Sequence, residues 1–190
     1  MKTIEQINKI ESVVLYVLRN FKEGVDYIKL FKILYFAQKD YLVNYGKVLC
    51  PDTFKARNYG PVPALSDKVV KLAEAQNEDW ADYPDLKRFG ESIRVVNQLV
   101  YANQEPDMDY LSKKECEFLD KWYAYCKDKD SVRELSPESH DEAYEKAYQR
   151  YLQDPQLGIL TCMEIAKAGG ATPKMMAYIR EKELFAAELA

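Results

Sequence analysis

The sequence has little of what enzymes and metal proteins usually need. It contains one histidine, His140, and four cysteines without a C-x-x-C pair, whereas a structural zinc site takes about four ligands, commonly in close pairs. The phosphate-binding patterns G-x-x-x-x-G-K-[ST] and G-x-G-x-x-G are missing, as is the nucleophile pattern G-x-S-x-G. We therefore expect no metal, no cofactor and no catalysis by this chain.

Two further absences bear on location. No segment approaches the run of about 20 apolar residues that a membrane-spanning helix needs. The first residues carry Lys2 and Glu5 and lack the apolar stretch of a secretory signal. These features predict a cytoplasmic protein whose thiols stay reduced.

The charge is weakly negative and unevenly spread. A net charge of −4 argues against a dedicated nucleic-acid-binding domain, which would normally be basic. Residues 1–95 carry 15 basic and 13 acidic side chains, whereas residues 96–190 carry 12 and 18. The acids concentrate between Asp128 and Glu145. Such a run is usually a solvated surface, but it also suits the docking of a basic partner.

Hydrophobic spacing predicts a mainly α-helical chain, folded as one compact domain with a small hairpin or short strands. Thr3 opens a capping box for a first helix, which we expect to end at Gly24. Asp26 can cap a second helix over about residues 27–44. That helix is apolar nearly all round, so we expect it in the centre of the core.

Glycine and proline interrupt the next part of the chain. Residues 54–57 alternate between apolar and polar and predict a short strand, and residues 92–102 predict a hairpin. In the intervening turn, Gly60 can adopt a backbone shape that other residues avoid, and Pro61 fixes φ for the start of a helix, which we expect over residues 63–76. Capping signals predict further helices, starting at Ser112, Ser131, Ser139, Thr161 and Thr172.

Two segments are more specific than generic helix patterns. The first is LFKILYFAQ, at residues 30–38, followed by YGK at residues 45–47; the second is FKARNYGPVP, at residues 54–63. Their order and spacing resemble the Panacea-domain, or SocA-like, antitoxin family, which shows K-L-x-K-L-L-Y-x-A-Q and then F-x-A-W-x-x-G-P-V. A weaker match covers residues 135–144. The family's tryptophan is Arg57 here.

The resemblance implies a structural role for most of its residues. It covers about residues 7–148, and we take residues 1–148 as a Panacea-like domain, with residues 149–190 as a C-terminal helical extension packed on or beside it. We expect Gln38 to satisfy buried backbone groups in the turn. The residues assigned to the motif are Leu34, Tyr35, Ala37, Gln38, Tyr59, Gly60, Pro61, Val62 and His140.

The resemblance also implies a function. Its members are antitoxins of bacterial or phage two-gene pairs of type II, which neutralise protein toxins by direct contact. Small alarmone-synthetase-like toxins are among the partners, and a toxin that grips RNA needs a basic surface. The acidic, tyrosine-rich helix after Ser139 would suit such a surface, and we expect its acids to be solvated. The candidate toxin-binding residues are Asp141, Glu142, Tyr144, Glu145, Tyr148 and Tyr151.

Other interpretations remain open. The tyrosines share one helix face, which could equally be the face that packs on the core. The protein could be a proteolytic adaptor that delivers its toxin to a protease, or a DNA-binding transcriptional regulator, although residues 27–44 are too apolar for a helix that reads base edges. A ligand or metal near His140 or Tyr59 would revive an enzyme of unfamiliar type.

Overall fold

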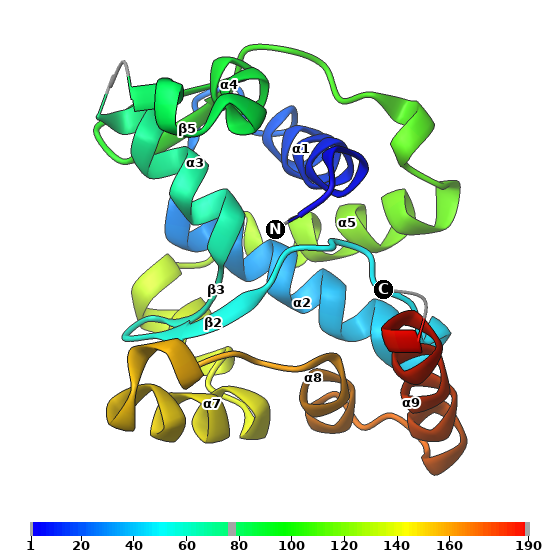
Figure 1. Cartoon of the computed structure of the whole chain (residues 1–190). Helices are drawn as coiled ribbons and strands as arrows, with labels where there is room; N and C mark the ends of the chain where they lie inside the picture. Colours follow the sequence, from blue (N-terminus) through cyan, green and yellow to red (C-terminus); the bar gives the residue numbers. More distant parts are fainter. Residues whose placement is uncertain (1, 76–78, 189–190) are drawn as a thin grey trace.

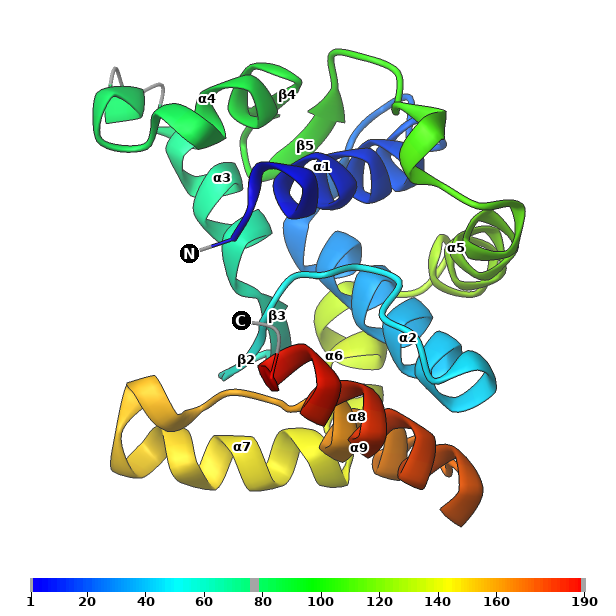
Figure 2. The same cartoon turned by 45° about the vertical axis from the view of Figure 1, so that its right-hand side comes forward.

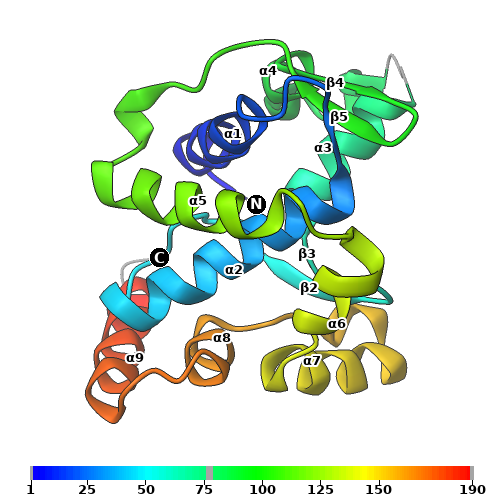
Figure 3. The same cartoon turned by 180° about the vertical axis from the view of Figure 1, so that it is seen from behind.

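A computed structural model describes residues 2–75 and 79–188 of the chain. Helix α2 (Tyr27–Tyr45) crosses the middle of the molecule (Figure 1). Helix α1 (Ile4–Leu18) and α3 (Ala64–Glu74) lie on one side of it, and α7 (Glu142–Gln153) lies on the other. Seen from behind, α5 (Lys113–Cys126) runs along α2 (Figure 3). The mainly helical fold in a single domain is confirmed.

The remaining elements are short, apart from the last helix. Helix α9 (Pro173–Glu188) packs against α8 (Cys162–Ala168), on the same side of the molecule as α7 (Figure 2). None of the described helices combines the length and the apolar character that crossing a bilayer requires. The short elements, together with the last helix, are β1 (Val25–Asp26), β2 (Phe54–Arg57), β3 (Gly60–Pro63), α4 (Pro84–Glu91), β4 (Ile93–Val96), β5 (Leu99–Ala102), α6 (Ser136–Glu138), α8 (Cys162–Ala168) and α9 (Pro173–Glu188).

The sequence of α2 explains its central position. The Asp26 side chain accepts a hydrogen bond from the Lys29 backbone at 2.9 Å and caps the helix, and Gly46 stops it in a left-handed conformation with φ of +59°. Apolar side chains point to every side of the helix, and Leu34 has no exposed surface. The predicted core position of this helix is confirmed, because α1, α5, α8 and β3 all pack around it.

One hairpin precedes α3 in the sequence, and a second one follows it. Strands β2 and β3 pair antiparallel from Phe54↔Pro63 to Arg57↔Gly60. On its free edge, β2 meets the segment before α8, where the Ala56 backbone N–H donates to the Gly158 carbonyl at 2.7 Å. Strands β4 and β5 form the second hairpin, to which β1 adds a two-residue third strand.

Two predictions about element ends are wrong, and one helix has no predicted counterpart. Helix α1 ends at Leu18 rather than at Gly24, and a turn leads from there into β1. Pro61 does not start a helix, since the chain stays extended through Pro63 and pairs with β2; the helix expected over residues 63–76 is present as α3 and begins at Ala64, and residue 76 lies outside the described residues. No sequence pattern predicts α4, which has Pro84 at its first helical position.

Two predicted caps are displaced along the chain. The short helix of residues 131–135 is a π-helix capped by Asp130, and α7 is capped by Asp141 rather than by Ser139. In both places an aspartate carboxylate accepts the free backbone N–H groups and displaces the serine hydroxyl from that role. The predicted caps Thr3, Ser112 and Thr161 are confirmed.

Candidate protein-binding site

A buried lysine lies beneath the turn of the β2–β3 hairpin. Lys32 comes from α2, has 1% of its surface exposed, and donates through Nζ to the Pro61 carbonyl at 3.3 Å. Burial lowers the pKa of this amine from 10.5 to about 7. Gly60 makes the close approach possible: it has φ of +101°, and a Cβ there would lie 2.4 Å from Lys32 Nζ and 2.3 Å from Ser139 Oγ. Glycine is thus required at position 60 for two reasons: its φ is positive, and a Cβ would not fit there.

Ser139 and His140 close the other side of this turn. Ser139 is fully buried and donates through Oγ to the Ser136 carbonyl at 2.7 Å. His140 stacks on Tyr144, with ring centroids 4.2 Å apart, and its buried Nε2 atom has no hydrogen-bond partner among the described residues. Burial first, and then the nearby Lys32, lower the pKa of His140. These groups lie against Gly60 and leave no room for a side chain there.

Asp141 joins α7 to α2. It accepts hydrogen bonds from the backbones of Ala143 and Tyr144, both at 3.1 Å, and from the Tyr35 hydroxyl at 2.8 Å. Lys39 lies 2.8 Å away and completes an ion pair. Burial and this carboxylate raise the pKa of Tyr35, so the hydroxyl stays protonated. The expectation that Asp141 is solvated is wrong, because a helix cap and two α2 side chains enclose it.

The tyrosines of α7 form a row against the β2–β3 hairpin. Tyr144, Tyr148 and Tyr151 stack in succession, and the Arg57 guanidinium lies 5.1 Å from the Tyr151 ring centre. The Tyr144 hydroxyl donates to the Arg57 carbonyl at 3.0 Å, and burial raises the pKa of Tyr144 to about 12. Tyr144 is buried, whereas Tyr148 and Tyr151 are half-buried. The face therefore packs on the hairpin and leaves Tyr148 and Tyr151 partly accessible.

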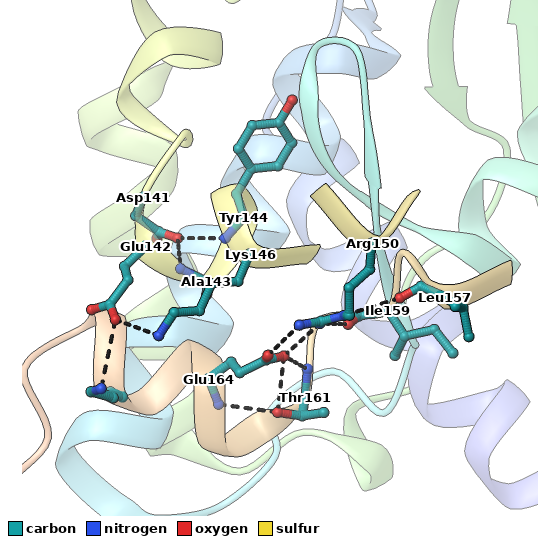
Figure 4. A network of polar contacts seen from close by, with 11 residues as sticks. Asp141, Glu142, Ala143, Tyr144, Lys146, Arg150, Leu157, Ile159, Thr161 and Glu164 are labelled. Atoms are coloured by element: carbon teal, nitrogen blue, oxygen red, sulfur yellow. Dashed lines mark hydrogen bonds and ion pairs between the residues drawn. The ribbon is translucent and has the colours of Figure 1, made fainter. Parts of the chain in front are cut away.

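Of the two glutamates of α7, one is already engaged in ion pairs. Glu142 is exposed and pairs with Lys146 at 2.6 Å and with Lys167 of α8 at 3.6 Å (Figure 4). Glu145 is exposed and forms no ion pair among the described residues. The acidic stretch is therefore less available to a partner than its composition indicates.

Arg150 fastens the start of the C-terminal extension to α7. Its guanidinium binds both carboxylate oxygens of Glu164 at 2.7 and 3.0 Å, and it also donates to the carbonyls of Leu157 and Ile159 (Figure 4). Glu164 itself belongs to the capping box that Thr161 opens. The chain between α7 and α8 is thereby held against β2.

The motif residues of α2 are buried in the core. Ala37 is fully buried, and the Gln38 side chain accepts hydrogen bonds from the backbones of Leu49 and Cys50 at 3.0 and 2.9 Å. The expectation that Gln38 satisfies buried backbone groups is confirmed, but these groups precede β2 and do not belong to the 59–62 turn. Tyr59, at the tip of that turn, is 54% exposed.

A cleft of about 240 Å³ opens beside the exposed Tyr59. Helix α2 provides Phe31 and Lys32, the hairpin provides Arg57, and α7 provides Tyr151. Sequence reasoning missed Lys32 and Arg57. A signal was present for each: a lysine in the middle of an otherwise apolar helix, and an arginine where the resemblance expects tryptophan.

These features define a helical scaffold that presents a rigid hairpin, an aromatic row and a small basic cleft, a combination suited to binding. Residues 30–145 match the model of the SocA-like antitoxin family with the Panacea domain. The match spans more than half of the chain, which therefore belongs to this antitoxin family. Neither a curated protein nor a solved structure matches the chain.

Proposed function

We propose that the chain is the antitoxin of a type II toxin–antitoxin pair and neutralises its toxin by direct protein–protein contact. The observation that carries this proposal is the family match over residues 30–145. That segment contains α2, the β2–β3 hairpin and the start of α7, so it contains most of the surface around the cleft. The family name indicates a toxin as partner, and the exposed aromatic surface supports contact with a protein.

The local chemistry favours binding over catalysis. Ser139 is buried and its hydroxyl is already used by a backbone carbonyl. His140 is stacked in the aromatic row, where no carboxylate among the described residues lies within hydrogen-bond distance to orient it. Burial raises the pKa of both Cys50 and Cys126 to about 12, so these thiols remain protonated and poorly nucleophilic at neutral pH. The proposal therefore contains no catalytic step.

A small alarmone-synthetase-like toxin remains our proposal for the partner class. The accessible parts of the predicted docking surface are Glu142, Glu145, Tyr148 and Tyr151. Asp141 and Tyr144 would act indirectly, by holding α7 on α2 and on the hairpin. The position of α2 argues against the regulator alternative, since a helix packed between α1, α5 and α8 has no free face to enter a DNA groove.

The test is expression of this chain together with the toxic reading frame from the neighbouring gene. We expect growth to be restored, toxin levels to stay unchanged, and the two purified proteins to elute as one complex in size-exclusion chromatography. Falling toxin levels in cells with active proteases would favour the adaptor alternative. Rescue without any complex between the purified proteins, or a gel shift on promoter DNA by the chain alone, would contradict neutralisation by direct contact.

A further inference from the structure

We propose that the cleft beside Tyr59 receives an acidic side chain of the protein partner, with Arg57 as its cation and Tyr59 and Tyr151 as its walls. This inference rests on the proposed function, because it assigns the docking point of that partner. It also changes the expected polarity of the contact at this point. The sequence indicated an acidic surface for a basic toxin, whereas the cleft offers positive charge to an acidic residue.

The charge of the cleft is unbalanced within the described chain. Arg57 forms no ion pair there: it donates to the carbonyl of Ala56 at 3.0 Å and lies over the Tyr151 ring. Lys32 has only its contact with the Pro61 carbonyl. The one acid among the residues that line the cleft is Asp67, and Lys71 neutralises it at 2.6 Å. Lys32 lies too deep to meet a partner directly, so an incoming carboxylate would meet the Arg57 guanidinium without a competing anion.

The size and composition of the cleft favour a side chain over a free small molecule. Small-molecule sites usually enclose about 300–1,000 Å³, whereas this cleft measures about 240 Å³. Tyrosine and arginine are also the residue types that dominate binding hot spots between proteins. A partner residue can insert a carboxylate beside Arg57 while its neighbours cover Tyr59, which is 54% exposed at the rim.

The turn that carries these residues is held in one conformation before any partner arrives. The Tyr59 carbonyl accepts from Ser136 Oγ at 2.9 Å, the Arg57 carbonyl accepts from Tyr144 at 3.0 Å, and Asn58 accepts from Tyr148 at 3.3 Å. Three consecutive residues are thus fixed by separate side chains. Binding at such a turn loses little conformational entropy, which favours its use as a recognition element.

The test compares two charge reversals in the full-length protein. Arg57→Glu changes the cleft, and Arg94→Glu is the matched control, because Arg94 also lies on a hairpin strand, stacks over a tyrosine at 4.2 Å and forms no ion pair among the described residues. Each variant is titrated with the purified toxin of the neighbouring gene by isothermal calorimetry. We expect at least about a tenfold loss of affinity for Arg57→Glu and less than about twofold for Arg94→Glu.

The outcomes separate the two proposals. If the unaltered protein does not bind the toxin, the proposed function fails; if it binds and Arg57→Glu binds equally well, only the cleft assignment fails. Should Arg57→Glu not fold, as judged by circular dichroism, Tyr59→Ala at the exposed rim replaces it, with the same tenfold expectation. Recovery of Arg57→Glu binding by an Asp-to-Arg or Glu-to-Arg change in the toxin supports the proposal.

A second experiment tests whether the cleft binds a small anion instead. If guanosine triphosphate raises the melting temperature of the unaltered protein but not that of Arg57→Glu, the cleft is a small-anion site and the proposal is overturned.

Discussion

The two hairpins of this molecule are alike in length but differ in what holds their turns. The β4–β5 turn is local: Asn97 and Gln98 both have positive φ, at +50° and +66°, and their side chains are exposed. This is the backbone shape of a tight two-residue hairpin turn. The β2–β3 turn is tertiary, because Lys32 from α2 lies beneath it, and Ser136 and Tyr144 donate hydrogen bonds to its carbonyls.

This difference determines which of the two turns is suited to serve as a recognition element. A turn formed by local geometry needs few neighbours, and it can change without disturbing the rest of the fold. A turn fixed by α2 and α7 has its orientation defined by distant parts of the chain, so it can present Arg57 and Tyr59 at a constant angle. We therefore expect changes around β2–β3 to affect stability and binding together, and changes in β4–β5 to affect stability alone.

The largest effect is expected from Gly60→Ala. A Cβ at this position would lie 2.3 Å from Ser139 Oγ and 2.4 Å from Lys32 Nζ, at a φ that L side chains rarely adopt. We expect a loss of about 2–5 kcal/mol in the free energy of unfolding, measured by urea denaturation. The control is Asn97→Ala in the local turn, which should cost about 1 kcal/mol. Equal costs at the two turns would show that the tertiary contacts at Gly60 are unimportant.

A smaller loss is expected from Asp141→Ala. The change removes the cap of α7 and leaves the Tyr35 hydroxyl and Lys39 without their acceptor. We expect a cost of about 2–3 kcal/mol in thermal or urea unfolding. Glu145→Ala, on the exposed face of the same helix, should stay within about 0.5 kcal/mol of the unaltered protein. An Asp141 variant as stable as the Glu145 variant would contradict the linking role.

Lys32 makes stability depend on pH. Its pKa is about 7 in the folded protein, below the usual 10.5, so between these values the folded state binds fewer protons than the unfolded state. Stability should therefore rise with pH above 7 and fall as pH drops toward 7. The useful window ends near pH 9, because the raised pKa values of Cys50 and Cys126 act in the opposite direction above it.

The measurement is the free energy of unfolding at pH 7 and pH 9. We expect the gain of the unaltered protein over this range to be on the order of 2 kcal/mol, and Lys32→Met to remove most of it by taking away the buried amine. Lys29→Met, which removes a half-buried lysine from the same helix, is the control and should retain the gain. An unchanged pH dependence in Lys32→Met would mean that another group titrates in this window.

The sequence predicted the parts of this fold that depend on local signals. Hydrophobic periodicity identified α2 as the core helix, and the Asn97–Gln98 hairpin followed from two short apolar runs. The expectation that Pro61 starts a helix is wrong because φ near −65° is compatible with an extended strand as well as with a helix start. The cap of α7 was placed at Ser139 because Ser139 and Asp141 are both good caps, and only burial of the serine decides between them.

The candidate site was harder to predict, because its members are far apart in the chain. Lys32 and Arg57 meet only once the hairpin folds over α2, and no periodic pattern encodes that contact. The tyrosine row was visible as a helical stripe, but the sequence left open whether it faces a partner or the protein. In the structure Tyr144 is buried on the hairpin, whereas Tyr151 is half-buried and lines the cleft.

The smallest expected effect is a gain, from Gln98→Gly in the local turn. Glutamine at φ of +66° carries the steric cost that a Cβ imposes in the left-handed region, which glycine avoids. The change also creates Asn-Gly, the pair most favoured in such turns. The greater freedom of glycine in the unfolded chain offsets part of the benefit. We expect a gain of at most about 1 kcal/mol, seen as a small rise in melting temperature, with toxin binding unchanged. A loss of toxin affinity in this well-folded variant would contradict the division between the two hairpins, because it would place the β4–β5 turn at the docking surface.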